Sequence, residues 1–396
     1  MILSLGLAGF VVMADNWVVS PIVPSIARDI GTSPVRTAVL ITAYMLPFAL
    51  FQLLYGPLAD RYGKLRVLQL TLIGFTVAAA LTALGVGLTD LTIYRALTGA
   101  FAAATMPVSL ALIGDTVRME ERQVAIGSFM GISFLGQGLS MGIGGAVAFL
   151  LNWRGVFLAY AALSAVVTVL MVLRSRGLAT AGNPNCEILA PYGRLLTQGR
   201  SVRTYLVTVV EGILILGSFS YLGAYLSHQF GLDNLAIGVV MTAFGVAAII
   251  AGRVTGRVAG RIGRRQTLVL GLLLAVIGDG AIFVVGGNLA IAAVAILLLG
   301  AGFMFAHSTL LTLATEFAAS ARGTAMSLVA FCFMGGGAVG TALGGRVLEA
   351  TSFGNFFGLW AALLLGLTVV AFVAVSDTLP SPVIECAPSV ARAPER

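Results

Sequence analysis

The sequence predicts an all-α membrane protein whose twelve transmembrane helices form two bundles of six. Three observations lead to this prediction. Hydrophobic residues make up 59% of the 396 residues and charged residues only 10%, whereas soluble globular proteins have about 45–50% apolar and about 25% charged residues. Apolar segments of about 20 residues, long enough to cross the hydrocarbon core as a helix, recur along the whole chain. The second half of the chain also repeats a pattern found in the first.

Twelve apolar segments separated by short polar connections are the predicted spans. The first has no charged residues before it and is too long for the apolar core of a signal peptide, so we interpret it as a span. The shortest connections, at 87–90 and 286–289, are the ones that hydropathy defines least. The predicted spans are 2–26, 37–57, 67–87, 90–114, 124–149, 155–173, 204–227, 235–256, 267–286, 289–313, 324–349 and 356–376.

Positive charges gather in alternate connections between the spans. The net charge is +7 at pH 7, and most Lys and Arg residues follow even-numbered spans, whereas the other connections carry little beyond Arg28, Arg36, Arg154 and Arg346. Loops rich in Lys and Arg stay in the cytoplasm. We therefore expect a protein of the bacterial inner membrane with both termini in the cytoplasm, and the distribution argues against a nucleic-acid partner.

The chain contains an internal repeat at an offset of 200 residues. GPLADRYGKLRVLQL (56–70) and GRVAGRIGRRQTLVL (256–270) share Gly, Ala, Arg and Leu positions, and the offset also relates Arg122 to Arg322. Six spans per half give both halves the same orientation, a parallel pseudo-two-fold repeat about an axis normal to the membrane. The predicted domains are an N-terminal bundle at 1–176, a cytoplasmic linker at 177–203, a C-terminal bundle at 204–376 and a disordered tail at 377–396.

Several motifs resemble the major facilitator superfamily of transporters, and the resemblance covers nearly the whole chain. GPLADRYGKLR is similar to the family's signature between spans 2 and 3, G-x-L-A-D-R-x-G-R-K. LTIYRALTG (91–99) is similar to its fourth-span motif with a central arginine, here Arg95. The resemblance implies the major facilitator fold and transport by alternating access around a central cavity.

The first span resembles the signature of the twelve-span drug:proton antiporter branch of that family. FVVMADNWVVSPIVPSIARDIG has an acidic residue in mid-span and a proline near the end, here Asp15 and Pro24. The chain departs from this branch in span 5, where Ser140 and Met141 stand in place of the usual Gly-Pro.

The loop after span 2 is implicated in gating by the same resemblance. Its aspartate, Asp60, would form an ion-pair network that closes the cytoplasmic side, with one of the motif's basic residues and with Asp115 at the end of span 4. We expect the motif's glycines to permit a tight turn. The predicted gating residues are Gly56, Asp60, Arg61, Gly63, Lys64, Arg66 and Asp115.

Charged residues within the spans are the leading candidates for function. A charge near the bilayer centre costs roughly 2.5–3.5 kcal/mol on insertion scales, so it needs a partner or a role. Asp15 lies midway along span 1, and we interpret it as a protonatable site or a counter-charge for a cationic substrate. Arg95 in span 4 is a candidate counter-ion for it. His307 in span 10 is a candidate cavity or proton-relay residue, and Asp279 in span 9 is interpreted as structural.

Glu211 lies about one-third of the way into span 7. Ser218 follows seven residues later, which predicts that one helix face joins the acid to a hydroxyl. The resemblance implies that spans 1 and 7 both line the central cavity. Two acids across one cavity suit proton coupling or cation binding. The alternative for each acid is a purely structural role, as a buried carboxyl paired with a neighbouring helix.

Aromatic and polar side chains on the cavity-forming spans complete the predicted site. Aromatic surfaces suit loosely specific binding of apolar molecules, although ordinary helix packing would place the same residue types there. The predicted coupling and binding residues, besides the four charged ones, are Asn16, Tyr44, Phe134, Gln137, Tyr221 and Phe331.

The motifs of enzymes and metal sites are missing from the sequence. Lys64 is followed by Leu65, so there is no GxxxxGK[ST] phosphate loop, and no HExxH or CxxC occurs. We expect neither a cofactor nor a metal. The hypothesis is a monomeric secondary transporter that exports a small amphipathic or cationic drug or metabolite in exchange for protons. A proton symporter or uniporter for a sugar or other nutrient stays open, as does, from another class, a membrane-bound enzyme or sensor.

Overall fold

The computed structural model describes residues 1–175, 190–317 and 322–375, without the side chains of 119–124, 190, 191, 194, 315–317, 322 and 323. The predicted tail at 377–396 and residues 177–189 of the predicted linker lie outside these residues. In the described part of the chain every regular element is helical. The expected all-α class is therefore confirmed.

In the ranges that the structure describes, eleven helices are long and apolar enough to span a membrane, and a bent pair of helices at the N-terminus makes a twelfth span. The predicted number of spans is confirmed, and the short connections near 87 and 287 are real helix breaks. The spans are Ile2–Trp17 with Val19–Asp29 (α1, α2), Pro34–Thr37 with Val39–Tyr62 (α3, α4), Lys64–Leu84 (α5), Leu88–Ala102 with Thr105–Thr116 (α6, α7), Met119–Leu150 (α8), Trp153–Arg174 (α9), Gly199–Glu211, Gly212–Leu216 and Gly217–Phe230 (α11, η1, α12), Asn234–Ile262 (α13), Arg264–Val285 (α14), Leu289–Phe317 (α15), Arg322–Ala350 (α16) and Phe353–Ala374 (α17).

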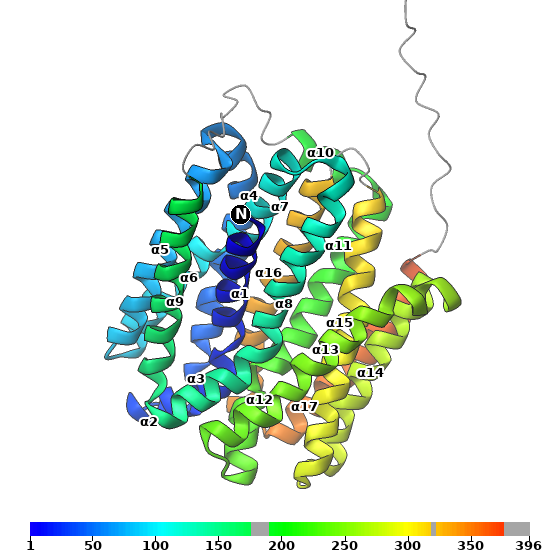
Figure 1. Cartoon of the computed structure of the whole chain (residues 1–396). Coiled ribbons are helices and arrows are strands. Elements are labelled where there is room, and N and C mark those ends of the chain that lie inside the picture. The colour runs from blue at the N-terminus through cyan, green and yellow to red at the C-terminus, as the bar shows by residue number, and fades with distance from the viewer. Residues whose placement is uncertain (176–189, 318–321, 376–396) are drawn as a thin grey trace, which may run out of the picture.

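The chain runs back and forth between two ends of the helix bundle (Figure 1). We call the end that holds Met1, Gly63 and Gly263 the terminal end, at the top of Figure 1, and the opposite end, with Gly31 and Gly231, the distal end. A short helix of the linker, α10 (Ala190–Leu196), lies at the terminal end. The last residues of the predicted linker are helical, because α11 begins at Gly199.

The two halves lie side by side, with α8 packed along α13 and α4 along α16. Small residues permit this approach: a Cβ on Gly238 of α13 would stand 2.6 Å from the carbonyl oxygen of Met141 and 2.9 Å from the Cα of Gly145, both in α8. Close contact between backbones is the usual way in which membrane helices associate, since lipid leaves little hydrophobic force between them.

The halves also contact each other at the distal end through α2. Span 1 bends by 51° between α1 and α2, and the bend brings α2 against α12. The hydroxyl of Ser20 donates to the carbonyl oxygen of Phe219 at 2.9 Å, and the amide of Asn234 donates to the hydroxyl of Ser25 at 2.9 Å. The distal end is therefore closed across the two halves by polar contacts as well as by packing.

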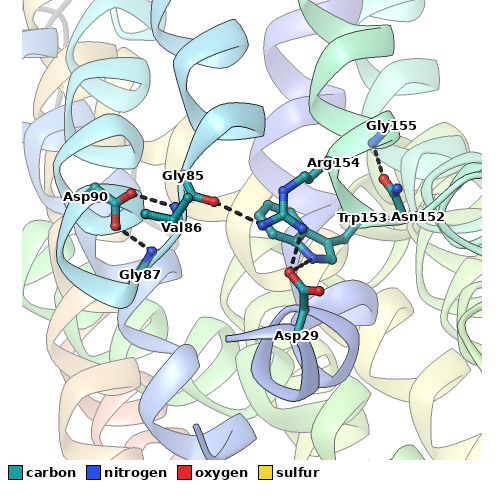
Figure 2. A network of polar contacts seen from close by, with 9 residues as sticks. All are labelled: Asp29, Gly85, Val86, Gly87, Asp90, Asn152, Trp153, Arg154 and Gly155. Carbon is teal, nitrogen blue, oxygen red and sulfur yellow. Dashed lines mark hydrogen bonds and ion pairs between the residues drawn. The ribbon is translucent and has the colours of Figure 1, made fainter. Parts of the chain in front are cut away.

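A polar network holds the distal end of α2 to the N-terminal half (Figure 2). The carboxylate of Asp29 accepts from Trp153 Nε1 at 3.2 Å and from Arg154 Nη1 at 2.5 Å. Arg154 also donates to the carbonyl oxygen of Gly85 at 3.2 Å, while Asp90 accepts from the backbone of the same connection. The network joins α2, the 85–87 connection and α9, so α2 is fixed to its own half.

Candidate functional site

The first component of the site is a fully buried ion pair between α1 and α6. Arg95 Nη1 donates to Asp15 Oδ2 at 2.7 Å and Nη2 donates to the backbone oxygen of Asp15 at 3.3 Å. Both side chains are 0% exposed. The guanidinium lies 4.4 Å from the ring centre of Tyr44 and 5.5 Å from that of Phe157. The candidate counter-ion of Asp15 is thus its partner in the structure.

This ion pair balances its own charge without water. Removing one member of a buried pair typically costs 3–5 kcal/mol, because the other charge is left uncompensated. A guanidinium stays protonated in proteins, and the rings on either side add attraction to the cation. The geometry therefore favours a permanent, charged pair that fixes α1 to α6.

The second component is a buried carboxyl beside a histidine in the C-terminal half. Glu211 ends α11 and is 0% exposed, while the side chain of His307 on α15 is 20% exposed; Nδ1 lies 3.3 Å from Glu211 Oε2. The imidazole is stacked on Phe303, with ring centres 5.4 Å apart, and lies 4.1 Å from the ring centre of Phe333. His307 is the member of this pair that is accessible from outside the packed core.

The predicted shared face of Glu211 and Ser218 is wrong. A π-helical turn, η1, lies between them, and its extra residue rotates all later side chains by about one helical position, roughly 100°. Glu211 therefore turns to His307, while the hydroxyl of Ser218 donates to Asp279 Oδ1 at 2.6 Å. Hydropathy carries no signal for a π turn, so the sequence pattern could not reveal it.

An aromatic cluster joins the two halves beside these pairs. Trp17 of α1 has ring-centre distances of 4.6 Å to Phe219, 5.5 Å to Phe244 and 5.7 Å to Phe303, all from the C-terminal half. Phe303 in turn stacks on Phe333 at 5.4 Å. We call these five residues the aromatic cluster. None of the five was among the predicted site residues; the position of Trp17 two residues after Asp15 was the available signal.

The remaining predicted binding residues do not form one cluster but lie on different helices. Asn16 is 5% exposed and its amide lies 4.0 Å from Met334 Sδ in the other half, and Tyr44 covers Arg95. Gln137 is buried in α8 and Phe134 half-buried there, and Phe331 is half-buried on α16.

Tyr221 lies apart from the aromatic cluster. Its hydroxyl donates to the carbonyl oxygen of Thr341 at 2.6 Å and its ring contacts Phe356. These contacts place Tyr221 in the packing of the C-terminal helices, away from the two buried pairs.

The gating motif forms an ion-pair network centred on Lys64. Its ammonium group lies 3.3 Å from Asp60 Oδ1 and is paired with Asp115 at the end of α7. Lys64 is thus the basic partner among the three predicted ones. Arg61, over the ring of Tyr62, and Arg66 are both exposed. The network joins α4, α5 and α7, all in the N-terminal half.

The two motif glycines differ in what the fold requires of them. Gly63 has φ of 94°, and its counterpart Gly263 has φ of 88°, a region that favours glycine. Gly56 lies inside α4, and a Cβ there would meet nothing within 4 Å. The prediction that Gly56 permits the turn is therefore wrong, since the turn lies seven residues further on, at Gly63.

Comparison with known families identifies the chain. A sequence model of the Major Facilitator Superfamily matches residues 5–223 and 204–385. The chain belongs to the Major Facilitator Superfamily. It is a multi-pass membrane transporter, and the family and the relatives below are transporters and not enzymes.

Two relatives and one solved structure illustrate the likeness. The MFS-type transporter YceJ of Bacillus subtilis is 27% identical over 387 residues, 93% of this chain and 94% of YceJ. The multidrug efflux pump LfrA of Mycolicibacterium smegmatis is 25% identical over 406 residues, 87% of this chain and 80% of LfrA. A bacterial homologue of the human lysosomal transporter Spinster, in an inward-facing and occupied conformation, has a TM-score of 0.78 at 16% identity, covering 96% of this chain and 98% of the homologue. That structure supports the two-bundle fold, as predicted.

Proposed function

We propose that this transporter exports a small amphipathic or cationic drug or metabolite in exchange for protons. It would act as a monomer in the bacterial inner membrane, by alternating access, with its terminal end in the cytoplasm. The observation that carries the proposal is the Glu211–His307 pair beside an aromatic cluster built from both halves. The relationship to LfrA, named as a multidrug efflux pump, supports the direction of transport.

The pair offers a single charge for which a proton and a cation compete. Histidine is the side chain whose unperturbed charge changes between pH 5 and 8. With His307 protonated, the pair is neutral. When that proton leaves, Glu211 keeps one net negative charge, and the rings of Phe303 and Phe333, which contact His307, attract a cation as well. Binding of proton and cationic substrate is then mutually exclusive, which is the requirement for exchange.

The Asp15–Arg95 pair is less suited to carry the exchanged proton. Protonation of Asp15 would leave the buried guanidinium of Arg95 without its counter-charge, at a cost of about 3–5 kcal/mol. We therefore assign the exchange to Glu211 and His307. In this proposal Asp15 and Arg95 position α1, and with it Trp17, against the C-terminal half.

The experiment is transport of the fluorescent cation ethidium in proteoliposomes with an imposed pH gradient. We expect the wild-type protein to move ethidium against the proton flux, and Glu211→Gln and His307→Gln to abolish the dependence on the gradient. His228→Gln is the matched control, because His228 is exposed at the distal end of α12. Undiminished exchange in the Glu211→Gln, His307→Gln double variant would sink the proposal. Movement of protons together with the cation would instead indicate symport.

A further inference from the structure

A third buried carboxyl, Asp279 on α14, lies outside both pairs. Its side chain is 0% exposed. Oδ1 accepts from the hydroxyl of Ser218 at 2.6 Å, whereas Oδ2 is buried without a hydrogen-bond partner. Among the described residues Asp279 takes part in no ion pair, in contrast to Asp15 and Glu211.

Among the described side chains, the helices packed around Asp279 place no positive charge against it. α17 contains no ionisable residue. His307 of α15 is bound to Glu211, and His228 is exposed at the distal end of α12. The other charged or titratable groups are the arginines near the terminal ends of α13 and α14 and two tyrosines of α12 that donate to backbone oxygens, namely Arg253, Arg257, Arg261, Arg264, Arg265, Tyr221 and Tyr225.

A lone carboxylate in this setting would be costly. An isolated charge within a span is strongly disfavoured, because the apolar bilayer and the helices around it cannot solvate it. A buried group without a counter-charge avoids that cost by becoming neutral. A protonated carboxyl also fits the hydroxyl of Ser218, since the acid and the hydroxyl can each donate or accept.

A cavity lies at the distal end of α14, between α12, α14 and the start of α17. It has a volume of about 370 Å³ and is lined by residues that include Tyr225, Gln229, Ile282, Phe283 and Asn288. Ile282 and Phe283 follow Asp279 by three and four residues, so this part of the lining lies about one helical turn, roughly 5.4 Å along the axis, from Asp279 in α14. Asp279 itself does not line the cavity, so a proton from the distal solution would have to cross about one turn of protein to reach it.

We propose that Asp279 and Ser218 form a proton-binding site in the C-terminal half, loaded from the distal face through this cavity. The step is the binding of one proton from distal water to the carboxylate, which gives a neutral carboxylic acid hydrogen-bonded to Ser218. The site is separate from Glu211 and His307, because the π turn points Ser218 to a different helix. It does not depend on the proposed exchange of protons for a cation.

The experiment is infrared difference spectroscopy of the full-length protein in liposomes between acidic and alkaline pH. We expect the carbonyl stretch of a protonated acid at neutral pH that Asp279→Asn removes and Ser218→Ala shifts. Glu349→Gln is the control, because Glu349 is 54% exposed and should leave the band unchanged. Persistence of the band in Asp279→Asn, or its replacement by a sodium-dependent change, would overturn the proposal.

The route from the distal face is tested by exchange of the acid proton for deuterium. Gly287 lines the cavity, and a Cβ there would meet nothing within 4 Å. Gly287→Phe should therefore fill the cavity and slow the deuterium shift of the band at least about tenfold. Gly260→Phe, at an equally open glycine near the terminal end, is the control. Equal exchange rates in the two variants contradict the distal route.

Thermal unfolding shows whether the Asp279→Asn variant is still folded. Asp279→Asn replaces a neutral acid by an amide of nearly the same shape that can still bond Ser218, so the melting temperature at neutral pH should be unchanged. A large loss of stability would show that Asp279 is ionised and paired, and would contradict the proposal. Because these readouts concern one carboxyl and not transport, their failure is distinguishable from failure of the proposed exchange.

Discussion

The first span of each half buries a carboxyl, and the two halves balance it differently. Asp15 in span 1 is bound to an arginine, whereas Glu211 in span 7 is bound to a histidine. At the repeat offset of 200, Asp15 corresponds to Ile215 and Glu211 to Val11, so the acids do not occupy equivalent positions. A guanidinium keeps its charge, while an imidazole can lose it near neutral pH. In the proposed mechanism the N-terminal pair is therefore fixed, whereas the C-terminal pair switches.

The largest expected effect comes from breaking the fixed pair. Arg95→Met leaves Asp15 buried without a counter-charge, and should destabilise the protein by about 3–5 kcal/mol. Thermal unfolding in detergent measures the loss. The Asp15→Leu, Arg95→Met double variant removes both charges and should recover most of the stability, whereas additive losses would show that the pair is not coupled.

The second prediction concerns a variant in which Glu211 is paired with an arginine, as Asp15 is. His307→Arg provides a positive charge that does not titrate. The protein should stay folded, because Glu211 keeps a counter-charge, but this site should no longer bind or release protons. We expect ethidium transport to lose its dependence on the pH gradient. The measurement is flux in proteoliposomes at two external pH values, and His228→Arg provides the control. A pH-driven flux that survives in His307→Arg would place the coupling elsewhere.

The third prediction concerns the aromatic cluster between the two pairs. Trp17 is the one member of the cluster that comes from the N-terminal half. Trp17→Ala should weaken binding of a lipophilic cation by about 0.5–2 kcal/mol, the range of a cation–π contact, and calorimetric titration measures it. Trp153→Ala is the matched control, because Trp153 lies in the distal network (Figure 2). Equal losses in both variants would point to a general effect on the fold.

The smallest effect on stability is expected in the gating motif. The C-terminal half has Gly260 where the N-terminal half has Asp60, so the second loop lacks the aspartate that pairs with Lys64 in the first. Asp60→Asn weakens a partly exposed pair, at about 0.2–1 kcal/mol. It should slow transport while leaving cation binding intact. Gly260→Asp serves as the reciprocal variant, and loss of binding with normal transport in Asp60→Asn would contradict a gating role.

Local patterns predicted much of the fold. Each span is a run of apolar residues that must cross the bilayer as a helix, so its place follows from hydropathy alone. The glycines of the signature loop also predicted a tight turn, which the structure places at Gly63 and, in the repeat, at Gly263. The motif around Arg95 also pointed to the counter-ion of Asp15, because a buried charge needs a partner and few were available.

The site was harder to predict, for reasons that individual residues illustrate. Glu211 was predicted to share a face with Ser218, yet the π turn separates them and each bonds a different helix. The partnership of Glu211 with His307, 96 residues apart, depends on how α11 and α15 pack. Asp279 was interpreted as a structural carboxyl, because nothing in the sequence around it shows whether a counter-charge lies nearby.

The sequence by itself determined the class of the protein: a twelve-span, two-half transporter with the family's signature loop after span 2 and several acids within its spans. These features follow from the apolar bilayer, which constrains every residue of a span in the same local way. Only the tertiary structure decided which acid has an arginine, which a histidine and which neither. That choice depends on contacts between helices distant in the chain, and on one π turn that rotates side chains by a single position.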